Sequence, residues 1–304
     1  MNTHPNLEIR FMERQLWPTL YHLVMTVGTS IRQVNVTYQP HILVLVHLWA
    51  ALHDRPASWA CDPRNWAHTT LRPAQLPAPA TLSRRLRSLA VGVLMRALAR
   101  PLREVLPARL VQALDGKPLP VGGASHDPDA RNGHGAGKIA KGYKLHAVWG
   151  GRPLPEAFAV EPLNVCETKA AERLLPELNG GGDRGYLLAD GEYDANPVFD
   201  AAGAAGYQLV APREDPEAGL GHRRQSPFRL RCIELLRGQF GQEVYALRGA
   251  IERSFGNATS FAGGLSPLPP WVRRAHRVWR WVCAKLLINA VRIVKNQGLT
   301  PQME

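Results

Sequence analysis

The chain contains 304 residues, of which 45% are hydrophobic, and it carries a formal net charge of +12 with a pI near 10.0. This composition excludes a disordered or fibrous chain, and the length allows one large domain or two of ordinary size. So strong a positive charge favours a polyanionic partner, most commonly nucleic acid, with a basic metabolic enzyme as the alternative.

The four cysteines form no metal-binding or disulfide pattern. Cys61, Cys166, Cys232 and Cys283 lie far apart, and no two of them are separated by just two residues. This spacing argues against a zinc ribbon or a disulfide framework and fits a reducing compartment. The first residues lack a signal-peptide pattern, and the longest apolar run, 42–52, is too short to span a bilayer. We therefore expect a cytoplasmic protein without a membrane segment.

Residues 1–106 are predicted to be mainly helical. The apolar run 41–52 is long enough for a buried helix, although its β-branched residues also allow a strand. A further helix is predicted over 82–94, with Thr81 or Ser83 as its N-cap. Arginines in its first turns could bind DNA phosphates, and the alternative is a solvated basic face on a core helix. These arginines are Arg84, Arg85 and Arg87.

From Val111 the pattern changes to short apolar runs broken by Gly and Pro, which is typical of alternating strands and helices. Gly137-Lys138 does not belong to a phosphate-binding loop, because Ile139 stands where such a loop needs Ser or Thr. The stretch 214–237 is predicted to be a basic, irregular connection. Strands are expected at 113–121, 141–149, 154–161, 186–189 and 207–212, and helices at 166–178, 197–205 and 271–295.

Three carboxylates stand out in this region. Asp115 and Asp190 each end a short apolar run, and Glu252 lies in a predicted helix over 245–256, four residues after Arg248 and on the same helix face. A salt-bridged surface helix is the alternative reading of that last segment. Two aspartates on strands and a later glutamate on a helix are what a two-metal site for phosphoryl transfer needs.

The chemistry of such a site explains the choice of carboxylates. Cutting or joining a phosphodiester needs an activated nucleophile and charge relief on the leaving oxygen, and two Mg²⁺ ions roughly 3.5–4 Å apart provide both. Magnesium prefers oxygen ligands. Asp115 would bridge both ions, while Asp190 and Glu252 would hold one each. The spacing of the three residues carries little weight alone, because aspartates are common.

The residues around these acids add a resemblance. Tyr245-x-x-Arg248-x-x-x-Glu252 resembles the signature around the third catalytic acid of DDE transposases of bacterial insertion sequences, particularly the insertion-sequence-four group. The segment 189–194 is similar to the block around their second aspartate. The segments 114–121 and 141–146 together are similar to the block around the first. The three blocks stand in the family's order, and the resemblance covers roughly 111–296.

The resemblance implies an α/β fold, in which an RNase H-like mixed sheet flanked by helices follows the helical N-terminal region. The catalytic domain would span 107–304 with its C-terminal helix, and 1–106 could bind DNA ends. Adjacent strands would bring Asp115 and Asp190 together, and the helix with Glu252 would complete the site. The implied reaction is nicking of double-stranded DNA at the transposon end, followed by attack of the 3′-hydroxyl on target DNA, with two Mg²⁺ or Mn²⁺ ions per site. Because transposon ends act in pairs, the resemblance also implies a homodimer when DNA is bound. The expected location is the bacterial cytoplasm, in association with the nucleoid.

Several residues beside the acids gain roles through the same resemblance. Tyr245 and Arg248 would orient Glu252 or grip flanking DNA, and Arg253 is a further DNA-binding candidate. Lys144, together with Tyr143 and His146, would line the DNA channel. The alternative for His146 is a strand residue without a role.

One residue departs from the family pattern. The fuller signature has a lysine seven positions after the glutamate, where this chain has Thr259. Either Arg253, Lys144 or another base substitutes for that lysine, or this copy is impaired. Near the second acid, Asp194 is the alternative to Asp190, while Glu192 is expected to point the other way.

Three alternatives to an active transposase remain open at this point. The first is an RNase H-like nuclease that cleaves without strand transfer. The second is a decayed or domesticated transposase relative that binds DNA without cutting it. The third is a basic metabolic enzyme, which the absence of a cofactor loop or a nucleophile constellation disfavours.

Overall fold

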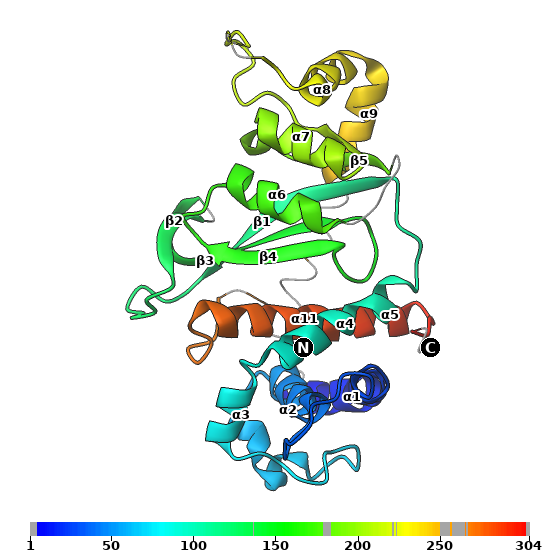
Figure 1. The fold of residues 1–304 in the computed structure, drawn as a ribbon, viewed down its shortest axis with the longest axis vertical. Coiled ribbons are helices and arrows are strands. Elements are labelled where there is room, and N and C mark those ends of the chain that lie inside the picture. Colours follow the sequence, from blue (N-terminus) through cyan, green and yellow to red (C-terminus); the bar gives the residue numbers. More distant parts are fainter. Residues whose placement is uncertain are drawn as a thin grey trace. The chain divides into compact units, whose positions relative to one another are not determined.

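The structure is a computed structural model that describes residues 5–135, 137–178, 184–220, 222, 224–249, 256, 265 and 267–301 (Figure 1). The chain divides into two compact units. The first comprises Met1–Leu106, Phe261–Gly264 and His276–Glu304, and the second comprises Pro107–Ser260 and Leu265–Ala275.

The first unit is helical in the part of it that the structure describes, as the sequence predicts for its N-terminal region. Its helices are α1 (Pro5–Gly28), α2 (Pro40–Leu52), α3 (Pro79–Arg85), α4 (Leu89–Ala97), α5 (Ala99–Arg103) and α11 (Ala275–Asn296), with 3-10 turns η1 (Trp59–Cys61) and η2 (Pro63–Trp66). The apolar run 41–52 is therefore a helix and not a strand. α2 is buried over most of its length, and Trp17, Trp49 and Trp66 pack together beside it with ring centroids 4.7–5.8 Å apart.

The helix predicted over 82–94 is in fact two helices, α3 and α4, separated by 86–88. α3 begins at Pro79, whose fixed φ suits the first helical position, so Thr81 and Ser83 lie inside the helix and do not cap it. The break also turns later apolar residues outward: the exposed fraction of Leu89 is 80%.

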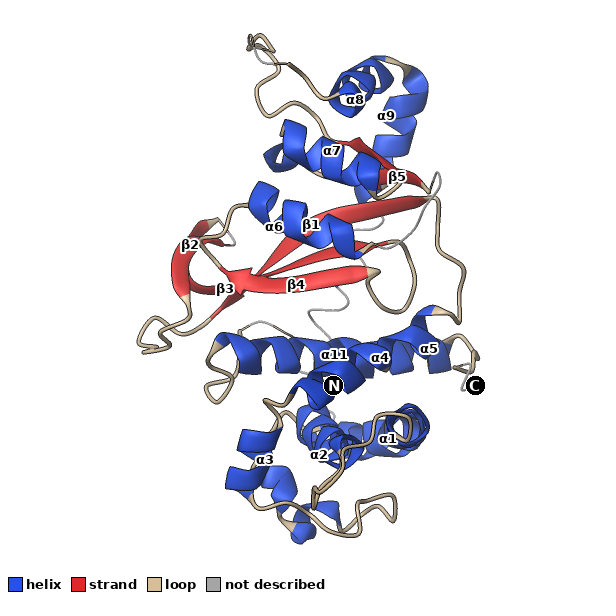
Figure 2. Ribbon diagram, viewed as in Figure 1, coloured by secondary structure: helices blue, strands red, loops and turns tan. Residues whose placement is uncertain are grey.

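The second unit is built on one mixed sheet (Figure 2). Its strands are β1 (Val111–Pro120), β2 (Arg131–Gly135), β3 (Lys138–Trp149), β4 (Ala157–Pro162), β5 (Gly185–Leu188) and β6 (Tyr207–Val210). The order is β2-β3-β1-β5-β6, and β4 also pairs with β3. β3 is antiparallel to β1, β2 and β4, while β5 is parallel to β1 and to β6. This arrangement is an RNase H-like sheet, as expected.

Helices flank this sheet. They are α6 (Glu167–Leu174), α7 (Asn196–Ala204), α8 (Pro227–Arg237) and α9 (Gln239–Ala246), with 3-10 turns η3 (Leu175–Glu177) and η4 (Gly191–Tyr193). α6 packs on β3 and β4, and α7 and α8 pack on β6. The core of this unit includes β6, which is buried along its whole length, and the last two residues of β5.

The hairpin of α8 and α9 differs from the prediction, which left most of this region as an irregular connection. α8 begins with a proline at its first position, and α9 follows after a turn at Gly238. The two helices approach closely because Gly241 has no side chain. A Cβ at Gly241 would lie 1.9 Å from the carbonyl oxygen of Leu235.

The last helix begins four residues later than predicted, and almost all of it belongs to the first unit instead of the catalytic region. It buries polar residues among the apolar ones. Arg280 donates a hydrogen bond to the carbonyl oxygen of Leu86, and Lys285 forms an ion pair with Asp54. No helix in the described ranges combines the length and the hydropathy that a membrane crossing needs.

Candidate active site

Asp115 on β1 and Asp190, two residues after the end of β5, lie at matching positions along two neighbouring strands. Ala113 on β1 pairs with Leu188, the last residue of the parallel strand β5, and each aspartate follows that pair by two residues. Neighbouring strands lie about 4.8 Å apart. The fold therefore brings the two carboxylate-bearing positions side by side at the carboxyl end of β5.

The backbone around Asp115 leaves room for a neighbouring strand's polar side chains. The N–H of Gly116 donates to Asp115 Oδ1 at 2.8 Å. A Cβ at Gly116 would lie 2.9 Å from Lys144 Cδ and 3.4 Å from His146 Nδ1. Because Gly116 has no side chain, the side chains of Lys144 and His146 on β3 can lie against β1 at this position.

Asp190 is held by the turn that it begins and by an arginine. Its carboxylate accepts the backbone N–H of Glu192 at 3.1 Å and caps η4. Arg248 Nη2 lies 3.5 Å from Asp190 Oδ2, and the Asp190 side chain remains 34% exposed. The second acid is therefore partly open to solvent and partly neutralised.

The single helix predicted over 245–256 is interrupted. α9 ends at Ala246, and the N–H of Leu247 bonds to the carbonyl oxygen of Val244, which tightens the last turn. Tyr245 thus lies in the last turn of α9, whereas Arg248 lies beyond it.

Glu252, Arg253 and Thr259 lie outside the described residues. Within the described part of the chain, no group of three or more His, Cys, Asp or Glu side chains is placed to hold a metal ion. The geometry therefore supplies two carboxylate positions, and the third acid stays a prediction.

A further acid, Glu167, was missed from the sequence. It is the first residue of α6 and forms an ion pair with Lys144 of β3, with side chains 15% and 10% exposed. Burial works to raise the pKa of Glu167, but the Lys144 ammonium and nearby backbone N–H lower it more. An acidic residue in the first turn of a helix was the available signal. Because Glu167 engages the Lys144 ammonium, the DNA contact predicted for Lys144 stays a prediction.

Glu192 and His146 lie beside this ion pair. The pKa of Glu192 is raised by burial and then by the carboxylates of Glu167 and Asp190. His146 is fully buried, and burial lowers its pKa to about 4, with Lys144 adding to the effect. His146 is therefore neutral near pH 7. Tyr143 instead donates its hydroxyl to Asp127 Oδ2 at 2.8 Å.

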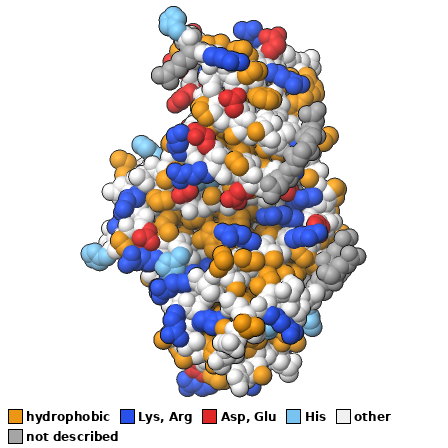
Figure 3. Space-filling model, viewed as in Figure 1, with side chains coloured by type: hydrophobic (Ala, Val, Ile, Leu, Met, Phe, Trp, Pro, Cys, Tyr) orange, Lys and Arg blue, Asp and Glu red, His pale blue; other side chains and the backbone are white. Residues whose placement is uncertain are grey.

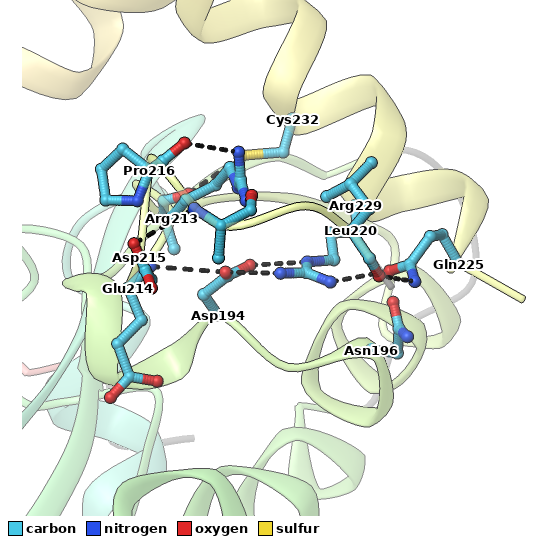
Figure 4. Close-up of polar contacts among 12 residues, drawn as sticks. Asp194, Asn196, Arg213, Glu214, Asp215, Pro216, Leu220, Gln225, Arg229 and Cys232 are labelled. Atoms are coloured by element: carbon cyan, nitrogen blue, oxygen red, sulfur yellow. Dashed lines mark hydrogen bonds and ion pairs between the residues drawn. The ribbon is translucent and has the colours of Figure 1, made fainter. Parts of the chain in front are cut away.

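Asp194 is occupied by an arginine (Figure 4). Arg229 of α8 donates from Nε and Nη2 to the two carboxylate oxygens at 2.7 and 2.6 Å, and the Asp194 side chain is 4% exposed. Arg229 also donates to Gln225 Oε1 at 2.7 Å. A bidentate, buried pair of this kind leaves Asp194 poorly suited to hold a metal ion.

The three arginines of the first unit differ in their surroundings. Arg84 and Arg87 are exposed. Arg85 donates to Gln33 Oε1 at 2.8 Å and to the carbonyl oxygen of Tyr38 at 3.3 Å, so it braces the loop before α2.

A family model described as the transposase DDE domain matches residues 107–287, more than half of the chain and a range that contains Asp115, Asp190 and Glu252. Among curated proteins and among solved structures, none matches the chain. The match does not distinguish between groups of insertion sequences. It agrees with the sheet order and with the two adjacent aspartates, and the chain therefore belongs to the family of transposases with a DDE domain.

Proposed function

We propose that this transposase binds the DNA ends of a bacterial insertion sequence and catalyses metal-dependent strand cleavage followed by strand transfer. The observation that supports it best is the register of β1 and β5, which sets Asp115 and Asp190 side by side within a DDE-domain match. Catalysis of this kind rests on positioning and charge stabilisation, without a covalent protein intermediate.

The residues present fit a pair of hard divalent cations. Asp115 and Asp190 both offer carboxylate oxygens, and the Asp190 side chain is 34% exposed, so a metal ion from solvent can reach it. Asp115 would bridge two Mg²⁺ or Mn²⁺ ions, and Asp190 and Glu252 would hold one each. Such ions, when bound, would activate water or a 3′-hydroxyl and stabilise the leaving oxygen.

Basic residues near the acids would position them and the DNA. Arg248 neutralises part of the Asp190 charge before cations bind, and with Tyr245 it would orient Glu252 or grip flanking DNA. Arg253 and Lys144 are proposed contacts for transposon-end phosphates. Arg84, Arg85 and Arg87 would contribute end binding from the first unit, with the exposed Arg84 and Arg87 best placed for it.

The proposed partner is double-stranded DNA, both as element ends and as target, bound by a homodimer in the bacterial cytoplasm beside the nucleoid. The net charge of +12 supports a polyanionic partner. In the view of Figure 3 the Lys and Arg side chains are scattered and do not gather in one patch.

The test is Mg²⁺-dependent nicking of linear DNA that carries the element's ends. Wild type is compared with Asp190→Asn and Glu252→Gln, and with Asp200→Asn as the matched control, because Asp200 is an exposed aspartate of α7. We expect wild type and the control to cut, and the other two variants to bind the ends without cutting. Cutting by Asp190→Asn at the wild-type rate would contradict the assignment.

A labelled 3′-end separates transposition from plain nuclease activity. Joining of the labelled end to a target duplex supports strand transfer, and cleavage without joining supports an RNase H-like nuclease. Thr259, which stands at the family's lysine position, favours one further candidate, a transposase relative that binds DNA and has lost the reaction. Tight, salt-sensitive end binding with no cleavage by wild type would identify it.

A further inference from the structure

A cavity of about 520 Å³ lies within the second unit, between the loop after β1 and the segment before α11. Ligand-binding cavities have volumes of roughly 300–1,000 Å³, so this one is of suitable size. Residues of 122–128 line it from the loop, and residues of 270–274 line it from the other side. Most of these lining residues are exposed, so the cavity is open to a ligand that approaches along the surface.

Two aspartates of the loop hold the frame of this cavity. Asp127 is 4% exposed and accepts the hydroxyl of Tyr143 at 2.8 Å and the backbone N–H of Arg274 at 2.9 Å. Asp129 accepts the backbone N–H of Ala275 at 3.0 Å. Both carboxylates are thus engaged in fixing the loop against the residues where α11 begins.

Arg273 lines the cavity and is anchored on one side only. Its Nε donates to Ser125 Oγ at 3.1 Å, and its Nη1 donates to the carbonyl oxygens of Leu268, Pro269 and Val272 at 3.4, 2.7 and 2.8 Å. Among the residues that the structure describes, none accepts a hydrogen bond from Nη2. The guanidinium is therefore held in place with donor capacity left over.

Arg274 and His126 line the same cavity and are exposed. The Arg274 side chain is 54% exposed, and its Nη1 lies 3.5 Å from Asp129 Oδ1. That separation is longer than the roughly 2.7–2.9 Å of a charge-assisted hydrogen bond. The second guanidinium is therefore held loosely and can turn to another acceptor.

We propose that this cavity binds a backbone phosphate of double-stranded DNA, with Arg273 and Arg274 as the donors to its oxygens. The inference rests on the function proposed above. Guanidinium groups suit phosphate because their N–H groups match its oxygens in geometry and charge. The net charge of +12 favours such an anionic ligand, and the exposed rim gives a long duplex access.

The phosphate bound here is not the one that is cut. Pro120, the last residue of β1, follows Asp115 by five residues, and the loop that lines the cavity comes after it. At about 3.3 Å per residue, this end of the strand lies roughly 17 Å from Asp115. The cavity would therefore fix the register of the duplex on the protein, a role that phosphate contacts commonly have.

The test uses Arg274→Asn, Arg274→Lys and Arg237→Gln in the full chain. Arg274 has a φ of 73°, which asparagine adopts more readily than most residues, and the backbone N–H that Asp127 accepts is kept. Lysine keeps the charge. Arg237 is the matched control, because it is an exposed arginine of the second unit in another loose ion pair, 3.2 Å from Glu234.

Three quantities are measured: Tm, the rate of nicking at saturating DNA, and the Kd for duplex DNA carrying the element's ends by fluorescence anisotropy. The Kd is also measured on duplexes in which single methylphosphonates neutralise one phosphate at a time.

For Arg274→Asn we expect the wild-type Tm, a Kd raised about 10-fold and the wild-type nicking rate at saturation. Neutralising one particular phosphate should weaken wild-type binding by a similar factor and leave Arg274→Asn unaffected. Arg274→Lys should lose less affinity than Arg274→Asn, and Arg237→Gln should bind as wild type does.

Wild-type affinity in Arg274→Asn would overturn this inference and leave the proposed function standing. So would effects of the variant and of the methylphosphonate that simply add at every position, or an equal loss of affinity in Arg274→Lys or Arg237→Gln. If wild type itself neither binds this DNA in a salt-sensitive manner nor nicks it, the proposed function fails, and the inference fails with it.

Discussion

At the scale of single residues, two aspartates four positions apart have different surroundings because different arginines reach them. Asp190 is partly exposed and faces Arg248 at 3.5 Å, whereas Asp194 is buried and gripped by both arms of Arg229. The sequence Asp190-Gly-Glu-Tyr-Asp194 cannot separate the two on composition, because Arg229 comes from a helix 35 residues after Asp194. The resemblance chose Asp190, and the pairing of Asp194 supports that choice.

The pairing predicts a stability effect for Asp194→Asn. The change leaves the Arg229 guanidinium buried, at 15% exposed, without its counter-charge. Breaking a buried ion pair on one side costs about 3–5 kcal/mol, and we expect the lower end because asparagine keeps one acceptor. Urea denaturation measures the free energy of unfolding. Glu234→Gln is the matched control, since the Glu234–Arg237 pair is 76% and 73% exposed and should contribute under about 1 kcal/mol. Equal losses in the two variants would contradict the argument.

At the scale of elements, the α8–α9 hairpin connects the two arginines that contact Asp190 and Asp194. α8 carries Arg229, which holds Asp194, and Arg248 follows α9 and reaches Asp190. α8 is fixed further by Phe228, whose ring fills the space beside Gly203, and whose carbonyl oxygen accepts from Gln208. The hairpin therefore sets where the chain enters the stretch that contains Glu252.

Gly241→Ala tests this dependence on close helix packing. The added Cβ would lie 1.9 Å from a backbone oxygen of α8, so the helices must separate, at a cost of about 1–3 kcal/mol. We expect lower stability and, because Arg248 moves with α9, slower nicking. Gly92→Ala in α4 is the control: nothing lies within 4 Å of its Cβ, and a helical Gly→Ala change should stabilise by about 0.5–1 kcal/mol. Stability changes of the same sign in both variants would refute the packing argument.

Most strands could be predicted from the sequence, but this hairpin could not. The strands β1, β3 and β6 follow from apolar runs bounded by Gly and Pro, a local signal. The region of α8 is rich in arginine and shows little apolar periodicity, and its helix is stabilised by contacts with distant residues. The same reason explains α11: its apolar pattern predicts a helix, but the unit to which it belongs depends on long-range contacts such as Lys285–Asp54.

At the scale of the whole molecule, positive charge is the property that bears on DNA. Lys and Arg number 37 against 25 Asp and Glu, and many of these cations are spread over the surface seen in Figure 3. Two of them form buried ion pairs in this region, Lys144 with Glu167 and Arg229 with Asp194. Exposed arginines outside such pairs are therefore the better candidates for phosphate contacts.

Salt dependence of DNA binding tests two of those candidates. Each phosphate contact that is lost should reduce the slope of log K against log salt concentration by about 0.9, so the double change Arg84→Gln, Arg87→Gln should reduce it by about 1.8. Arg64→Gln is the control, because Arg64 is exposed but already bonded to Asp62. We expect the control to keep the wild-type slope in a salt titration of end binding by fluorescence anisotropy. A double variant with an unchanged slope would place the DNA away from α3, and end recognition would then have to come from other residues.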